Sequence, residues 1–322
     1  MKTAVRSPVL LYHAVYETVP SPLENRIHNV NPETFYKQMK WLKENYDIVS
    51  IMDNPLDPSL GIVSVTFDDG NRSVYSQAVP VLESMSIPAT VFPIGCTFSG
   101  SIFWRDKLRL IMYLGLEKEF ILHLGEYYGV NFMPFRKSLL DATKEGVCCD
   151  AILDKVSDEL LGCFMDLKTK PDWHSLETPK RKPSTLLRFG NHTFSHYRQS
   201  VLSPETQEFE ITQGEMAVRR EHGRCEKALA IPFGRVRDLG SATLRISKEL
   251  EYQMILFCEQ DWSEPTACSQ DSALGTLRFV NRLKAPNSAH ELQRLLITPA
   301  ESNGKFLSTA ECAFNRERVH ST

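Results

Sequence analysis

Seven short runs of apolar or β-branched residues stand out along this chain. Several are nearly continuous rather than alternating, which is the pattern of strands buried on both faces of a sheet. We therefore expect seven buried strands, which cover residues 9–13, 62–67, 89–94, 186–190, 228–232, 253–258 and 274–280.

Helical patterns lie between these runs. Over residues 32–45, Phe35, Met39 and Leu42 fall on one stripe, and Asn31 stands where an N-cap is expected. Strands that alternate with helices indicate a parallel sheet with right-handed crossovers, and seven of them favour a closed or nearly closed barrel. Similar patterns predict further helices over residues 73–85, 204–222, 241–250 and 288–296.

The alternation is interrupted once, between the third and fourth expected strands. Residues 104–166 have mainly helical patterns, and the Pro- and Lys-rich stretch 168–184 is interpreted as a connector. Because the next strand resumes the barrel, we interpret 104–184 as a helical insertion and linker within a single barrel domain over 1–300. Residues 301–322 have no convincing periodicity and are expected to form a C-terminal tail.

The composition is that of a globular protein, with 322 residues, 42% hydrophobic and 24% charged. A net charge of −3 gives no electrostatic reason to expect nucleic acid as a partner. The apolar stretch 9–12 is too short for a signal-peptide core, and segment 108–116 is about half a membrane span. We therefore expect a cytoplasmic protein without a transmembrane segment, whose eight cysteines are reduced thiols.

Two adjacent carboxylates follow the second expected strand. Asp68 and Asp69 precede Gly70, and an Asp-Gly pair after a strand can simply form a turn. Adjacent side chains project in different directions, so one carboxylate can ligate a metal ion while the other stays free as a base. A bound cation would favour the ionised form of both carboxylates.

Two imidazoles, His192 and His196, stand four residues apart. At helical spacing they would share a face, and with one carboxylate they could hold a divalent metal that keeps open positions. Exposed polar residues at the start of a helix are the structural alternative.

The turn Pro232-Phe233-Gly234 would mean little in isolation, but it follows the fifth expected strand. A backbone N–H there could face a developing oxyanion. His13 likewise ends the first strand. Parallel barrels gather their chemistry at the carboxyl ends of their strands, where these residues and the Asp and His pairs all fall.

Three motifs resemble, in this order, those of the polysaccharide deacetylases of carbohydrate esterase family 4. They are TFDDG at 66–70, HTFSH at 192–196 and IPFG at 231–234. The opening LYHAV at 11–15 is similar to the N-terminal strand of one branch of that family, as is SIPATVF at 86–92.

The resemblance implies a distorted (β/α)7 barrel and the metal-dependent removal of an acetyl group from an acetamido sugar. By the same resemblance Asp69, His192 and His196 would bind the metal. Asp68 would be the general base, and the backbone N–H of Phe233 would help to stabilise the oxyanion. Zn²⁺ is the metal expected from the ligand types, although other first-row ions accept two imidazoles and one carboxylate.

Two parts of the family pattern are missing. Many members carry an arginine two residues before the proline of the turn, tethered to the base, where this chain has Ala230. The late Leu-x-His motif that supplies the general acid is not recognisable either. His13 is a better candidate for the acid than His290, although a structural role for His13 is equally open. Three arginines could replace the missing one: Arg235, Arg72 and Arg105.

These patterns predict a cytoplasmic N-deacetylase that acts on an acetamido group of a polysaccharide or its precursor. Two alternatives remain open. The same site could hydrolyse another non-peptide amide, as deformylases and cyclic-amide hydrolases do, or the barrel could bind carbohydrate after losing turnover. The sequence predicts no oligomeric state.

Overall fold

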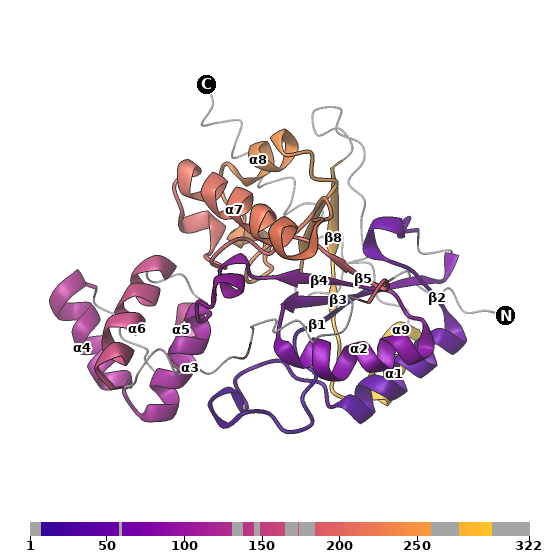
Figure 1. The fold of residues 1–322 in the computed structure, drawn as a ribbon, viewed down its shortest axis with the longest axis horizontal. Helices are drawn as coiled ribbons and strands as arrows, with labels where there is room; N and C mark the ends of the chain where they lie inside the picture. The colour runs from indigo at the N-terminus through magenta and orange to yellow at the C-terminus, as the bar shows by residue number, and fades with distance from the viewer. Residues whose placement is uncertain are drawn as a thin grey trace.

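Parallel strands form the centre of the molecule in the computed structural model (Figure 1). The structure describes residues 8–57, 60–130, 138–144, 149–164, 173, 184–258 and 277–297. The larger sheet has the order β5-β4-β3-β1-β9, with the short β2 paired to β3, and the smaller sheet has the order β6-β7-β8. The strands are β1 (Val9–Tyr12), β2 (Asp47–Ile48), β3 (Ile62–Asp69), β4 (Ala89–Pro93), β5 (Leu187–Phe189), β6 (Ala228–Ala230), β7 (Met254–Phe257), β8 (Arg278–Asn281) and β9 (Leu283–Lys284).

The two sheets meet at both ends. A parallel bridge between Asn191 and Leu229 connects the β5 side to β6. At the other junction the chain runs from β8 to β9 with only Arg282 between them, so one continuous segment pairs first with β7 and then with β1. The α/β fold with parallel strands is therefore confirmed, and each of the seven expected strands is present. The two-residue strands β2 and β9 were not predicted, because such short segments have no period to detect.

Helices cover the strands on both sides (Figure 1). Phe35, Met39 and Leu42 of α1 are fully buried, and the Asn31 side chain accepts a hydrogen bond from the Glu33 N–H, as an N-cap does. Burial of three such side chains stabilises the fold by roughly 1.5–3 kcal/mol each. The covering helices are α1 (Pro32–Asn45), α2 (Val79–Met85), α7 (Pro204–His222), α8 (Thr243–Glu249) and α9 (Ala289–Ile297). The π-helical turn η4 (Val74–Ala78) leads directly into α2. The described residues also contain the 3-10 turns η1 (Ser21–Leu23), η2 (Ile51–Asp53), η5 (Gly95–Ser99), η7 (Gln199–Val201) and η8 (Val236–Asp238).

Among the described residues, four further helices lie between β4 and β5 and form a separate group beside the sheets (Figure 1). They pack around their own apolar cluster, which includes Trp104, Leu108 and Phe120 and also contacts the ring of Phe233. The expected helices after residue 104 are thus present. The helices are α3 (Trp104–Leu114), α4 (Glu117–Tyr128), α5 (Leu139–Thr143) and α6 (Asp150–Phe164). Most of the expected connector 168–184 and all of 301–322 lie outside the described residues, and the domain boundaries stay predictions.

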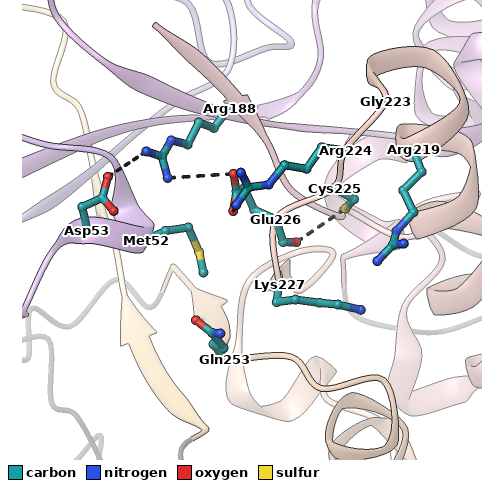
Figure 2. Close-up of a pocket in the computed structure, with 10 residues that line it drawn as sticks. All are labelled: Met52, Asp53, Arg188, Arg219, Gly223, Arg224, Cys225, Glu226, Lys227 and Gln253. Carbon is teal, nitrogen blue, oxygen red and sulfur yellow. Dashed lines mark hydrogen bonds and ion pairs between the residues drawn. The ribbon is translucent and has the colours of Figure 1, made fainter. Parts of the chain in front are cut away.

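The described residues contain no membrane-spanning helix, and they form a notable cavity. Among the described helices, none has both the length and the apolar character needed to cross a membrane. A cavity of about 450 Å³ opens near the amino ends of β6 and β7, beside β5 (Figure 2).

Candidate metal centre

The alternation of β3 determines where its two aspartates point. Val63, Val65 and Phe67 pack in the apolar core beneath α1 and α2. The intervening positions point the other way, and Asp68 is buried on that side. Continued alternation would return Asp69 to the apolar core, but its φ of +66° lies in the left-handed region and turns the chain. The two carboxylates therefore occupy different environments, as expected for adjacent residues.

The two histidines lie in a loop after β5, so the helical arrangement inferred from their spacing is wrong. Left-handed backbone at Thr193 (φ +64°) and His196 (φ +60°) folds the loop instead and brings the rings to a centroid distance of 4.6 Å. Non-glycine residues rarely adopt this conformation, which costs of order 1–3 kcal/mol and occurs mainly at functional sites. Asp69 and Phe233 also have left-handed backbone. Four non-glycine residues with this conformation, Asp69, Thr193, His196 and Phe233, therefore surround one site.

Hydrogen bonds from neighbouring elements hold this loop in place. The Nδ1 of His192 lies 2.8 Å from the Ala230 carbonyl oxygen, which fixes the proton on Nδ1 and leaves Nε2 free to accept a metal. From α7, Glu210 accepts hydrogen bonds from the N–H of Phe194 through its carbonyl and from that of Ser195 through its carboxylate. The loop is thus anchored to β6 and α7.

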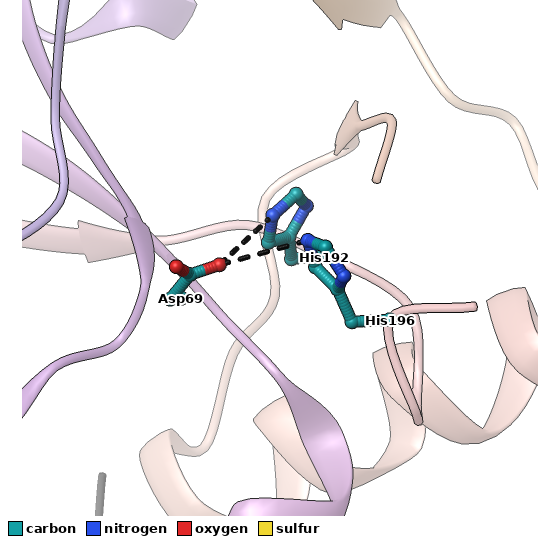
Figure 3. A group of neighbouring side chains, drawn as sticks. All are labelled: Asp69, His192 and His196. Carbon is teal, nitrogen blue, oxygen red and sulfur yellow. Dashed lines mark ion pairs between the residues drawn. The ribbon is translucent and has the colours of Figure 1, made fainter. Parts of the chain in front are cut away.

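Asp69, His192 and His196 converge on one point (Figure 3). The Oδ1 of Asp69 lies 3.5 Å from Nε2 of His192 and 3.6 Å from Nε2 of His196. These distances are long for hydrogen bonds. They match the edge of a tetrahedron of ligands around a first-row ion, which is about 3.4 Å when each ligand bond is about 2.1 Å. The donor set and its geometry therefore fit a divalent metal.

Protonation at the site is set by burial and by the mutual charges. Burial lowers the pKa of His196 well below its usual value, so this imidazole is neutral at neutral pH. Burial acts to raise the pKa of Asp69, but His192, His13 and His196 hold it well below its usual value. A neutral imidazole and an ionised carboxylate are the states that ligate metals. For His192, burial acts to lower the pKa while Asp68 and Asp69 raise it, so a cation would compete with a proton there.

Asp68 is held by an arginine that sequence reasoning missed. The guanidinium of Arg282 donates two hydrogen bonds of 2.6 Å, one to each carboxylate oxygen of Asp68, and Arg282 is fully buried. Arg282 thus holds Asp68, a place for which the sequence left Arg235, Arg72 and Arg105 as open candidates. The available signal was position, since Arg282 follows the seventh apolar run by two residues and so lies at the carboxyl end of a strand.

His13 follows β1 and pairs with a second histidine that carried no sequence signal. The Nε2 of His28 lies 2.8 Å from the Ala285 carbonyl oxygen and must donate to it, because a carbonyl only accepts. Burial, with the charge of His13, lowers the pKa of His28 to about 2, so His28 is neutral and its Nδ1 accepts. The Nδ1 of His13, 3.2 Å away, is therefore the donor, and Nε2 of His13 is left for other contacts. His290 is exposed on α9.

Phe233 lies in the turn after β6 with φ of +65°. Its ring packs under two guanidinium groups, with Arg198 at 4.5 Å and Arg105 at 5.2 Å from its centroid. Arg198 also bonds to Asp238 and donates its backbone N–H to Asp150 of the insertion. The insertion helices therefore help to hold the turn whose N–H was predicted to face an oxyanion.

Together these observations define an α/β protein with a candidate mononuclear metal centre at the carboxyl ends of parallel strands. The family model of the polysaccharide deacetylases matches residues 57–111 and 184–255, which contain the three metal-ligand candidates, Asp68 and Phe233. Over these residues the chain is similar to the polysaccharide deacetylases, as its motifs indicated.

A bacterial relative is similar to this chain over part of its length. The chain is 33% identical over 95 residues to the "Putative polysaccharide deacetylase YxkH" of Bacillus subtilis (strain 168). That match covers 27% of this chain and about a third (32%) of the length of the relative.

Solved structures of deacetylases share the fold. The Streptococcus pyogenes deacetylase PplD in complex with acetate is 20% identical with a TM-score of 0.54, over 92% of this chain and 100% of that chain. IcaB from Ammonifex degensii is 16% identical with a TM-score of 0.51, over 92% and 99%. These likenesses support the architecture described above.

Proposed function

We propose that this protein is a metal-dependent hydrolase that removes N-acetyl groups from an acetamido sugar. One observation carries the proposal. His192, His196 and Asp69 converge at the distances of a tetrahedral metal site, and a second carboxylate, Asp68, lies beside them without being needed as a ligand. The relationship to the polysaccharide deacetylases supports an acetylated carbohydrate as the substrate.

Asp69, His192 and His196 would hold the metal, for which Zn²⁺ is the first candidate. When bound, such an ion acts as a Lewis acid on the amide carbonyl and makes water a stronger acid. The tethering of His192 to Ala230 prepares its Nε2 for this role before any ion arrives.

The residues of the chain divide the remaining work of amide hydrolysis. Asp68 takes a proton from the attacking water, while the bidentate contact with Arg282 holds its carboxylate in one orientation. The backbone N–H of Phe233 faces the oxygen of the tetrahedral intermediate. His13 holds its own proton on Nδ1, so its Nε2 would first take up a proton, such as the one that Asp68 removes from the water, and then pass it to the leaving nitrogen as the C–N bond breaks. Acetate and a free amine then leave.

Arg282 also bears on the non-enzymatic alternative. That alternative rested on Ala230 and on the absence of a Leu-x-His motif. Arg282 supplies an arginine to Asp68, and the His13–His28 pair offers an imidazole, so both gaps have candidate occupants. A barrel used only for binding would have no need of an oriented buried carboxylate.

The test is acetate release from a panel of amides by the metal-loaded full chain. The panel contains N-acetylglucosamine oligomers, the matching formamido sugars and cyclic amides, and Asp68→Asn serves as the control. Acetate from an acetamido sugar, lost in the control, supports the proposal. Formate or ring opening alone would move the activity to another amide, and no turnover with metal bound would favour the binding role. The cytoplasmic location stays a prediction.

A further inference from the structure

A basic pocket lies away from the metal centre, where the chain enters the strands rather than where it leaves them. Arg188 lies on β5, Lys227 directly precedes β6 and Gln253 directly precedes β7, while Arg219 and Arg224 come from the end of α7 and the loop after it (Figure 2). The cavity is the one of about 450 Å³ described above. Asp69, His192 and His196 lie at the opposite, carboxyl ends of the strands, so this is a separate feature.

Two carboxylates organise the four cationic groups of the pocket. Glu215 bonds to both Arg219 (2.7 Å) and Lys227 (2.8 Å). Glu226 lies 3.1 Å from Arg224 and 3.9 Å from Arg188. Arg188 additionally pairs with Asp53, 3.0 Å away at the rim of the pocket. The four cations exceed these three carboxylates by one charge.

The exposure of the charged side chains determines which of them a ligand in the pocket would contact. The side chains of Glu215 and Glu226 are only 10% and 5% exposed, whereas those of Arg219 and Arg224 are 52% and 74% exposed. Each guanidinium has five N–H donors and spends few of them on its carboxylate. The carboxylates therefore form the floor that fixes the cations. The exposed guanidinium groups of Arg219 and Arg224 keep N–H donors for a ligand, whereas the ammonium group of Lys227 is bonded to Glu215 and to the Leu250 carbonyl oxygen.

We propose that the basic pocket binds a phosphoryl group. A tetrahedral dianion accepts many hydrogen bonds at once, and it suits several fixed guanidinium groups better than a single carboxylate does. A volume of about 450 Å³ leaves space beyond a free phosphate, for a phosphoryl group carried on a sugar as well as for a free anion. The inference is independent of the proposed deacetylation.

The experiment is calorimetric titration of the full chain with inorganic pyrophosphate and, separately, with N-acetylglucosamine 1-phosphate. Saturable binding is expected, weakened on the order of tenfold by Arg219→Gln and again by Arg224→Gln. Tighter binding of the sugar phosphate would identify a carried phosphoryl group, and equal or weaker binding would identify a free anion. Arg245→Gln is the matched control, because Arg245 pairs with Glu249 at 2.8 Å on the surface of α8.

The binding should also survive His192→Ala, which separates the basic pocket from the metal centre. Loss of binding in that variant would place the anion at the metal and overturn the proposal. No saturable binding of either probe, or an equal loss in Arg245→Gln, would overturn it as well. Thermal unfolding of each variant shows whether the fold is retained.

Discussion

Replacement of Arg282 by methionine tests the contact on which the orientation of Asp68 depends. Methionine has a similar length but no charge, so Asp68 would keep its buried position and lose both hydrogen bonds of 2.6 Å. Arg282 is fully buried and Asp68 is 4% exposed, so water cannot readily replace the partner. Removal of one member of a buried ion pair costs about 3–5 kcal/mol, because the other charge is left uncompensated. The weaker bond from Nε of Arg282 to the Phe257 carbonyl, 3.3 Å long, is lost as well.

We therefore expect Arg282→Met to lower the free energy of unfolding by about 4 kcal/mol, measured by urea denaturation of the metal-free protein. Addition of Asp68→Asn removes the stranded charge, so the double variant should recover at least about 2 kcal/mol of that loss. Arg278→Met on β8 is the control, because among the described residues Arg278 donates one hydrogen bond, to the Asn54 carbonyl oxygen, and its replacement should cost only about 1 kcal/mol. A loss in Arg282→Met no larger than in the control, or a double variant less stable than the single one, would refute the reasoning.

Four other changes have expected outcomes. Asp68→Asn should lower turnover by about 10²–10⁴ while the metal content is unchanged, and normal turnover would remove Asp68 as the base. His28→Ala should lower kcat on the order of tenfold with little change in KM, because Nδ1 of His13 loses its hydrogen-bond partner. The nitrogen NMR shifts of His13 report which tautomer it adopts, and His290→Ala is the matched control. Gly214→Ala places a methyl group 2.7 Å from the Thr193 carbonyl carbon. The substitution should therefore lower the free energy of unfolding by about 1–3 kcal/mol and weaken metal binding. Unaltered metal affinity would contradict the placement of the loop that carries His192 and His196. Burial raises the pKa of Asp150 from 3.8 to about 6, so the native state holds the Asp150 proton more tightly than the unfolded state does. The contribution of Asp150 to the free energy of unfolding therefore falls by up to about 3 kcal/mol as the pH rises from about 4 to 6. In Asp150→Asn this part of the pH dependence should be absent from urea unfolding curves.

Much of the fold could be predicted because its determinants are local. The stripe of Phe35, Met39 and Leu42 and the cap at Asn31 lie within a few residues, and α1 begins and ends where they indicate. The longer strands were visible as apolar runs because most of them are buried on both faces, whereas the two-residue strands β2 and β9 are too short to show a period. The four-residue spacing of His192 and His196 indicated a helix, but this prediction was wrong. Left-handed backbone at Thr193 and His196 forms a loop instead, and this loop also brings the two rings together.

The parts of the site that could not be predicted depend on contacts between distant segments. Arg282 meets Asp68 across 214 positions, and only the closure of the strands between β8 and β1 brings them together. His28 reaches Ala285 across 257 positions by the same closure. The position of Arg282 after the seventh apolar run indicates the end of the sheet at which it lies but not its partner, whereas the adjacent aspartates and the His pair lie in compact motifs.

The most direct test of the account is the metal content of the purified chain, measured by mass spectrometry on wild type, His192→Ala and the control His290→Ala. We expect about one divalent ion per chain in wild type and control, and its loss in His192→Ala, because removal of one imidazole leaves only two protein ligands. A folded wild type that holds no ion after exposure to zinc, cobalt and nickel would contradict the assignment of Asp69, His192 and His196 as a metal centre.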